Sequence, residues 1–122
     1  MFEVVIKETS KDLSVKERVA IKQIDSFTGL GDLDPETAPL IDVDYFAVLA
    51  VHNDEAETKD YDLYIVADKD GTIYKTSSTA FWSNFKSMMD ELYGTDEEYK
   101  IKVLFKESKN YKGKSYVTCT LV

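Results

Sequence analysis

Apolar and polar residues alternate in several short segments of the chain, and this period of two is typical of β-strands that bury one face. A nearly continuous apolar run, residues 45–51, indicates a strand that is covered on both faces. The pattern predicts strands over residues 2–7, 19–27, 41–52, 61–67, 72–75, 99–106 and 116–121. Strands therefore dominate the expected structure.

Helical periodicity is concentrated in one segment. From residue 79 to residue 93, apolar side chains recur every three or four positions, which predicts an amphipathic helix that ends at Gly94. A shorter signal lies near the N-terminus, where Ser14 is followed three residues later by Glu17. This is the spacing of a capping box, and it predicts a brief helical turn before the strand over residues 19–27.

Glycine, proline and aspartate mark the connections between these elements. Residues 29–40 contain both prolines and two glycines, which predicts a loop. The dipeptide Asp70-Gly71 supplies the positive φ that tight turns need, so residues 61–75 are expected to form a hairpin. Residues 107–114 form the loop between the last two strands.

The order of these elements is several strands with a hairpin, one helix, and two further strands. This order favours an all-β barrel, the five-stranded OB fold with one α-helix between its third and fourth strands. A β-sandwich would not need the helix, and a ferredoxin-like fold would need two. Because more than three strands precede the helix, residues 2–7 are expected to be an additional strand. The length of 122 residues fits a single domain over residues 1–122.

Charge is distributed unevenly along the chain. The net charge is −8, which argues against binding to nucleic acid, but residues 99–122 carry six lysines against one glutamate, a net charge of +5. The preceding 98 residues carry −13. A local basic segment can hold a phosphate backbone even when the whole molecule is acidic.

Few residues are available for catalysis or metal binding. The chain has a single histidine, His52, and a single cysteine, Cys119, so a zinc site of the usual kind is not expected. No pattern resembles a nucleophile elbow. We therefore expect no enzymatic activity and no cofactor. No apolar run reaches the roughly 20 residues that span a bilayer, and the N-terminus lacks a signal-peptide pattern, which predicts a cytoplasmic protein.

In an OB fold the nucleic acid lies across the second and third strands and the loops joining strands one to two and four to five. Residues 99–116 interleave cations with aromatic rings, as binding of single-stranded nucleic acid requires. The predicted contact residues in this segment are Lys100, Lys102, Lys106, Lys109, Tyr111, Lys112, Lys114 and Tyr116. Four further candidates lie earlier in the chain: Tyr64, Tyr74, Phe27 and Arg18.

A simpler explanation exists for each of these residues. Lysines at a hairpin tip are often only solvated, and lysines on edge strands prevent pairing with other chains. Tyr64 and Tyr74, predicted on the face opposite Leu63, could equally pack beneath a loop. Arg18 directly precedes the strand expected over residues 19–27, and it belongs to a face of this region that is only weakly basic. The aromatic ring of Tyr111 in the loop favours a binding site over a solvated tip.

Three segments also resemble small single-stranded DNA-binding proteins encoded by phages of Gram-positive bacteria. These segments are Ser14-Val-Lys-Glu-Arg-Val-Ala-Ile-Lys22, Asp70-Gly-Thr-Ile-Tyr-Lys-Thr-Ser-Ser-Thr-Ala-Phe81 and Ser108-Lys-Asn-Tyr-Lys-Gly-Lys-Ser-Tyr-Val-Thr-Cys-Thr-Leu121. The resemblance implies an OB fold that binds single-stranded DNA without sequence preference during phage DNA replication and recombination. It also implies a phage recombinase or strand-annealing protein as a partner, in the cytoplasm of the host cell.

The chain departs from the bacterial single-strand-binding pattern because it ends in a strand at Val122 rather than in an acidic tail. Recruitment of a partner by such a tail is therefore in doubt, and the sequence leaves open whether the chain forms a homodimer. The charge of −13 over residues 1–98 supports a second hypothesis, an acidic interaction module or DNA mimic that binds a host protein.

Overall fold

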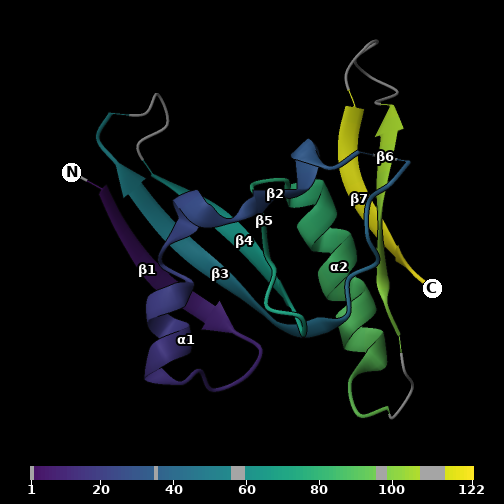
Figure 1. The fold of residues 1–122 in the computed structure, drawn as a ribbon, viewed down its shortest axis with the longest axis horizontal. Coiled ribbons are helices and arrows are strands. Elements are labelled where there is room, and N and C mark those ends of the chain that lie inside the picture. Colours follow the sequence, from purple (N-terminus) through teal and green to yellow (C-terminus); the bar gives the residue numbers. More distant parts are fainter. Residues whose placement is uncertain (1, 35, 56–59, 96–98, 108–114) are drawn as a thin grey trace. The chain divides into compact units, whose positions relative to one another are not determined.

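The computed structural model describes residues 2–34, 36–55, 60–95, 99–107 and 115–122. Figure 1 shows the order of the elements along the chain. They are β1 (Phe2–Thr9), α1 (Val15–Ala20), the 3₁₀ helix η1 (Ile24–Ser26), β2 (Thr28–Gly29), the 3₁₀ helix η2 (Leu30–Asp32), β3 (Val43–Asn53), β4 (Asp60–Asp68), β5 (Ile73–Thr76), α2 (Thr79–Leu92), β6 (Ile101–Glu107) and β7 (Ser115–Leu121).

These elements form two compact units, each assembled from two segments of the chain. Unit 1 contains Met1–Gly29 and Val43–Ser77, and unit 2 contains Leu30–Asp42 and Ser78–Val122. The expectation of a single domain over residues 1–122 stays a prediction. Neither unit contains, in its described part, a helix that is long and apolar enough to cross a membrane.

Unit 1 is built on a five-stranded sheet with the strand order β1-β3-β4-β5-β2. The pairs among β1, β3, β4 and β5 are antiparallel, whereas β2 runs parallel to β5. Leu49 lies opposite Leu63 in the β3–β4 register, and Ala47 lies opposite Ile65. Since side chains alternate between the two faces of a sheet, this register places the buried aliphatic residues of both strands on one face.

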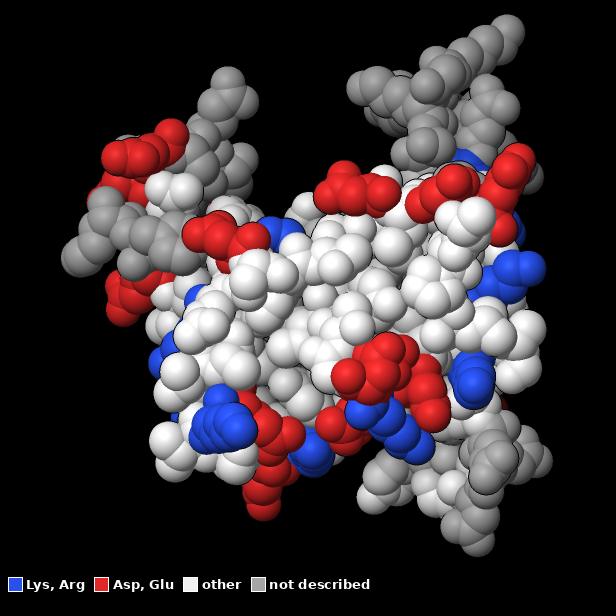
Figure 2. Space-filling model, viewed as in Figure 1, with Lys and Arg blue, Asp and Glu red and all other residues white. Residues whose placement is uncertain are grey.

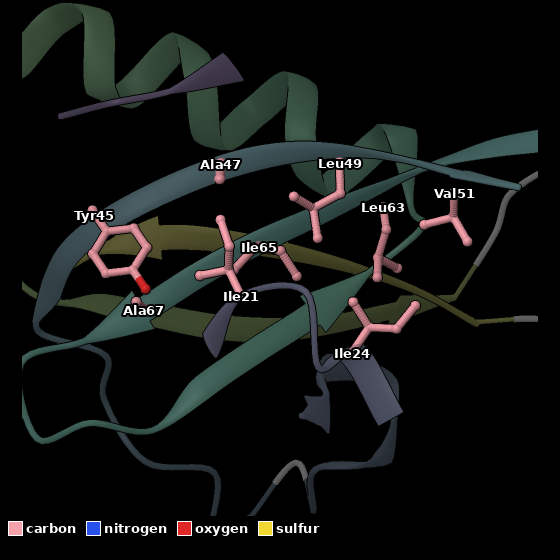
Figure 3. Close-up of a cluster of buried hydrophobic side chains, with 9 residues drawn as sticks. All are labelled: Ile21, Ile24, Tyr45, Ala47, Leu49, Val51, Leu63, Ile65 and Ala67. Atoms are coloured by element: carbon pink, nitrogen blue, oxygen red, sulfur yellow. The ribbon is translucent and has the colours of Figure 1, made fainter. Parts of the chain in front are cut away.

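The core of unit 1 lies on this face, where β3 and β4 meet Ile21 and Ile24. Figure 3 shows the labelled side chains of the two strands pointing toward these two isoleucines. Leu49, Ile65 and Ile21 are fully buried. The apolar run that predicted a strand over residues 41–52 is confirmed by β3, as are the strands expected over residues 2–7, 61–67 and 72–75.

The strand predicted over residues 19–27 is wrong. Residues 15–20 form α1, and η1 follows it. The capping box at Ser14 is confirmed, because the Ser14 side chain accepts from the Glu17 N–H while the Glu17 carboxylate accepts from the Ser14 N–H. Val19 and Ile21 have the spacing of a strand, but Val19 is 55 % exposed, whereas the buried residues Ile21 and Ile24 are three positions apart, a helical spacing.

Two glycines have the positive φ angles that the turns require. Gly71 has a φ of 98° in the β4–β5 turn, and its N–H donates to the carbonyl of Asp68 at 3.0 Å. Gly94 has a φ of 79° just after α2, where the helix was expected to end. Both turns are therefore as the sequence predicted.

Unit 2 consists of the β6–β7 hairpin, α2 and the segment from Leu30 to Asp42. Helix α2 lies against β7. Its fully buried residues Phe81 and Phe85 stack with a centroid distance of 5.7 Å, and Cys119 of β7 is also buried. The two strands and the helix were all predicted from the sequence.

The described strands form an open five-stranded sheet and a separate two-stranded sheet. The chain is thus mostly β, as expected. A closed barrel is not present among the strands of the described residues, so the expected five-stranded OB barrel is not confirmed.

Candidate nucleic-acid interface

One face of the β6–β7 hairpin carries exposed basic and aromatic side chains on either side of the less exposed pair Leu104 and Thr118. Lys106 lies directly opposite Tyr116, and Lys102 lies opposite Thr120. The two lysines are exposed, and Tyr116 is 39 % exposed. Lys100 precedes β6 and is also exposed. Ile101 and Val103 point to the other face and are buried, which confirms the alternation predicted for this strand.

The register explains why these side chains share a face. Lys100 and Val122 exchange two backbone hydrogen bonds, of 3.4 and 3.0 Å. In an antiparallel pair every second residue along the strand lies on the same face. Lys102 and Lys106 are therefore on one face, about 13 Å apart at about 3.3 Å per residue.

The end of the hairpin that is distant from its loop is held on both outer edges. Ile101 exchanges two backbone hydrogen bonds of 2.8 Å with Ile41. On the other edge, the Asn84 side chain of α2 donates to the Cys119 carbonyl at 2.6 Å and to the Thr118 hydroxyl at 3.0 Å. These contacts anchor the strands, while Lys106 and Tyr116 lie at the opposite end, next to residues 108–114.

Four predicted contact residues lie outside the described residues: Lys109, Tyr111, Lys112 and Lys114. Their assignment stays a prediction. Figure 2 shows basic side chains, together with acidic ones, in the region of β6 and β7.

The structure places the earlier tyrosines differently from one another. Tyr64 and Tyr74 lie on the same sheet face, opposite Leu63, as predicted. Tyr74, however, is only 4 % exposed, so it is wrong as a stacking platform. Burial, followed by the nearby carboxylates of Asp68 and Asp70, raises the pKa of the Tyr74 hydroxyl. Tyr64 is half-buried and keeps part of its ring accessible.

Phe27 and Arg18 are the remaining candidates. Phe27 is half-buried and packs against the core of unit 1. Arg18 is exposed, but it lies on helix α1 rather than on a strand. The basic face expected from alternate positions of a strand is therefore wrong. In the helix and its cap, Arg18 is instead about one turn from Lys22.

An acidic hollow of unit 1 was not predicted from the sequence. It has a volume of ≈ 480 Å³ and lies between Val5 and the ends of β3 and β4. Both ring nitrogens of His52 form hydrogen bonds with carboxylates. Nδ1 lies 2.6 Å from an oxygen of Asp60, and Nε2 lies 2.6 Å from an oxygen of Asp54. These hydrogen bonds, first to Asp60 and then to Asp54, raise the pKa of His52.

Further carboxylates border the same hollow. Glu3 lies opposite His52 in the β1–β3 register, and Asp62 forms an ion pair with Lys7 at 3.1 Å. Figure 2 shows acidic side chains gathered where the β3–β4 connection lies. The acidic character of residues 53–60 was visible in the sequence, but the cross-strand alignment of Glu3, His52 and Asp60 depends on the register.

No family model, curated protein or solved structure matches the chain. Within the described residues, no group of three or more His, Cys, Asp or Glu side chains is arranged to hold a metal ion. The function proposed below therefore rests on the residues and contacts described above.

Proposed function

We propose that the chain binds single-stranded DNA without sequence specificity through the exposed face of the β6–β7 hairpin. The observation that carries the proposal is the placement of Lys102, Lys106 and Tyr116 on one accessible face. Cations that follow the phosphate backbone and rings on which bases stack are the two components of sequence-tolerant single-strand binding. The predicted contacts in residues 108–114 would extend this face.

The order of the elements supports an OB fold as the framework. Strands β3, β4 and β5 form a meander, α2 follows, and β6 and β7 form a hairpin. In this proposal they are the five strands and the helix of the OB fold, and β1 is an additional strand. A barrel also needs its first strand to pair with the strand that follows the helix. The isolated bridge between Ile41, two residues before β3, and Ile101 of β6 supports such a pairing.

The biological role follows from the resemblance to phage single-strand-binding proteins. The chain would protect single-stranded DNA during phage replication and recombination in the host cytoplasm, beside a recombinase or strand-annealing protein. It would have no catalytic activity of its own. Association into a homodimer is compatible with this role.

The uneven charge is consistent with a localised contact. A net charge of −8 repels DNA at long range, and salt screens this repulsion over about 10 Å at 0.1 M. The lysines of the hairpin attract phosphates at contact distance, and each contact releases counterions from the strand. The acidic end of unit 1, where Glu3, Asp60 and Asp62 lie, would disfavour contact with DNA.

The test is a titration of labelled oligo-dT and of a duplex of the same length at two salt concentrations. We expect the oligo-dT to bind more tightly than the duplex, with affinity falling by a slope of about 0.7 per phosphate contact in log–log form. Absence of oligo-dT binding at the lower salt concentration would contradict the proposal.

The acidic hollow favours a second candidate, an acidic interaction module that binds a basic protein. The carboxylates of Glu3, Asp60 and Asp62 border the hollow, and Val5, which is 50 % exposed, lines it. A lysine-rich peptide is the suitable probe. This candidate predicts that the peptide binds, that Asp60→Asn weakens its binding, and that no oligonucleotide binds.

A further inference from the structure

A second cavity lies within unit 1, between the segment that follows α1 and the β4–β5 turn. Its volume is ≈ 260 Å³. Phe27 and Ile73 line it with apolar surface, and Gln23, Thr28 and Thr72 line it with amide and hydroxyl groups. None of the residues that line this cavity carries a formal charge.

The parallel pairing of β2 with β5 builds the apolar part of the cavity. Thr28 pairs with Tyr74, so the residues before them, Phe27 and Ile73, lie next to each other. The backbone of Phe27 is held by a hydrogen bond from its N–H to the carbonyl of Ile24 at 3.3 Å. The same carbonyl accepts from the Lys75 ammonium group at 2.8 Å, which ties η1 to β5. These hydrogen bonds hold the backbone at Phe27 next to β5.

The chemistry of the lining suits an uncharged, planar group with polar edges. Phe27 offers an aromatic surface, and the Gln23 amide can both donate and accept hydrogen bonds. A phosphate would find no cation among the lining residues. Pockets for drug-sized ligands are roughly 300–1,000 Å³ in volume, so a cavity slightly below this range fits a single ring system rather than a whole nucleotide.

The exposed residues that neighbour the lining residues in the sequence carry charges of both signs. Lys22 directly precedes Gln23, and Asp25 directly precedes Ser26.

We propose that this cavity receives one base of the bound single strand, with Phe27 as the stacking wall and Gln23 and Thr72 as hydrogen-bonding partners. The inference rests on the proposed binding of single-stranded DNA. In this inference unit 1 contributes a base contact of its own.

The test compares Phe27→Leu with Phe27→Tyr in titrations with oligo-dT. Loss of the ring is expected to raise the Kd about tenfold, the equivalent of 1.4 kcal/mol, because stacking contributes on this scale. Phe27→Tyr keeps the ring and should bind within about twofold of the original protein. Gln23→Ala alters an exposed side chain, so its effect on binding is independent of the core. Thermal melting checks that Phe27→Leu remains folded.

An abasic oligonucleotide of the same length separates base contacts from backbone contacts. Phe27→Leu should leave its affinity unchanged. The cavity inference is overturned if Phe27→Leu and Gln23→Ala bind oligo-dT as tightly as the original protein. It is also overturned if Phe27→Leu weakens binding of the abasic oligonucleotide by the same factor as binding of oligo-dT. In both cases single-strand binding stands. If the original protein binds no oligo-dT, the proposed function is overturned, and the base contact with it.

Discussion

Removing the hairpin lysines should change the salt dependence of DNA binding in a calculable way. Lys102 and Lys106 are exposed on the same face of β6, so each can neutralise one phosphate. Each lost contact reduces the slope of log affinity against log salt by about 0.7, and the double alanine variant should lose about 1.4. Between 50 and 200 mM salt its affinity should therefore fall about sevenfold less than that of the original protein.

Tyr116→Ala should weaken binding with a different signature. Stacking of a base contributes roughly 1–3 kcal/mol, and because the residue is 39 % exposed we expect the lower end, about 1 kcal/mol or fivefold in affinity. Stacking neutralises no phosphate and releases no counterions. Its loss should lower affinity equally at every salt concentration and leave the slope unchanged.

Fluorescence anisotropy of labelled oligo-dT at 50, 100 and 200 mM salt measures both effects. Lys16→Ala is the matched control for one lysine, because Lys16 is exposed on α1 of unit 1 and is not part of the hairpin. Tyr93→Ala is the control for the ring, since Tyr93 is 91 % exposed at the end of α2. An unchanged slope in the double lysine variant, or an equal decrease in Lys16→Ala, would refute the assignment of the face.

Three further predictions concern stability and reactivity. Hydrogen bonding, first to Asp60, raises the pKa of His52, so the stabilising contribution of the protonated His52 is present below pH 6.5 and is lost as the pH rises through the folded pKa. His52→Gln should remove this part of the pH dependence of the free energy of unfolding, measured in urea. An unaltered pH profile would contradict the prediction. Burial raises the pKa of Cys119 to about 12, so a thiol reagent at pH 8 should react only with the unfolded protein, and rapid labelling of the native protein would be inconsistent with this burial. Leu49→Ala should lower the free energy of unfolding by about 2–5 kcal/mol in urea titrations, because Leu49 is fully buried. Val5→Ala, at a half-exposed site, should have a much smaller effect. Equal effects would argue against the assigned core.

Much of the fold was predictable because local periodicity and turn chemistry agree with the tertiary structure. The apolar run of β3 and the Asp-Gly turn identified the β3–β4–β5 meander. Apolar spacing and Gly94 identified α2 and its end. Residues 19–27 were misassigned because Val19 and Ile21 fit the period of a strand, while Ile21 and Ile24 fit that of a helix. Only the packing of Ile21 and Ile24 against β3 and β4 shows which pair is buried.

The candidate site was predictable only in part. The alternation of β6 placed Lys102 and Lys106 on an exposed face, because the buried residues Ile101 and Val103 occupy the other one. Tyr74 could not be assigned in the same way. Its alternation with Ile73 gives the face on which it lies, but its burial depends on residues from elsewhere in the chain.

The sequence by itself determined the strands other than β2, the main helix, the turn glycines and the basic segment near the C-terminus, since each depends on residues that are close together in the chain. Only the tertiary structure decided the register that aligns Glu3 with His52 and the parallel pairing that brings Phe27 beside Ile73. These contacts join residues more than 40 positions apart, and no local period specifies such pairings. The residues that line the two cavities are brought together by strand register and packing.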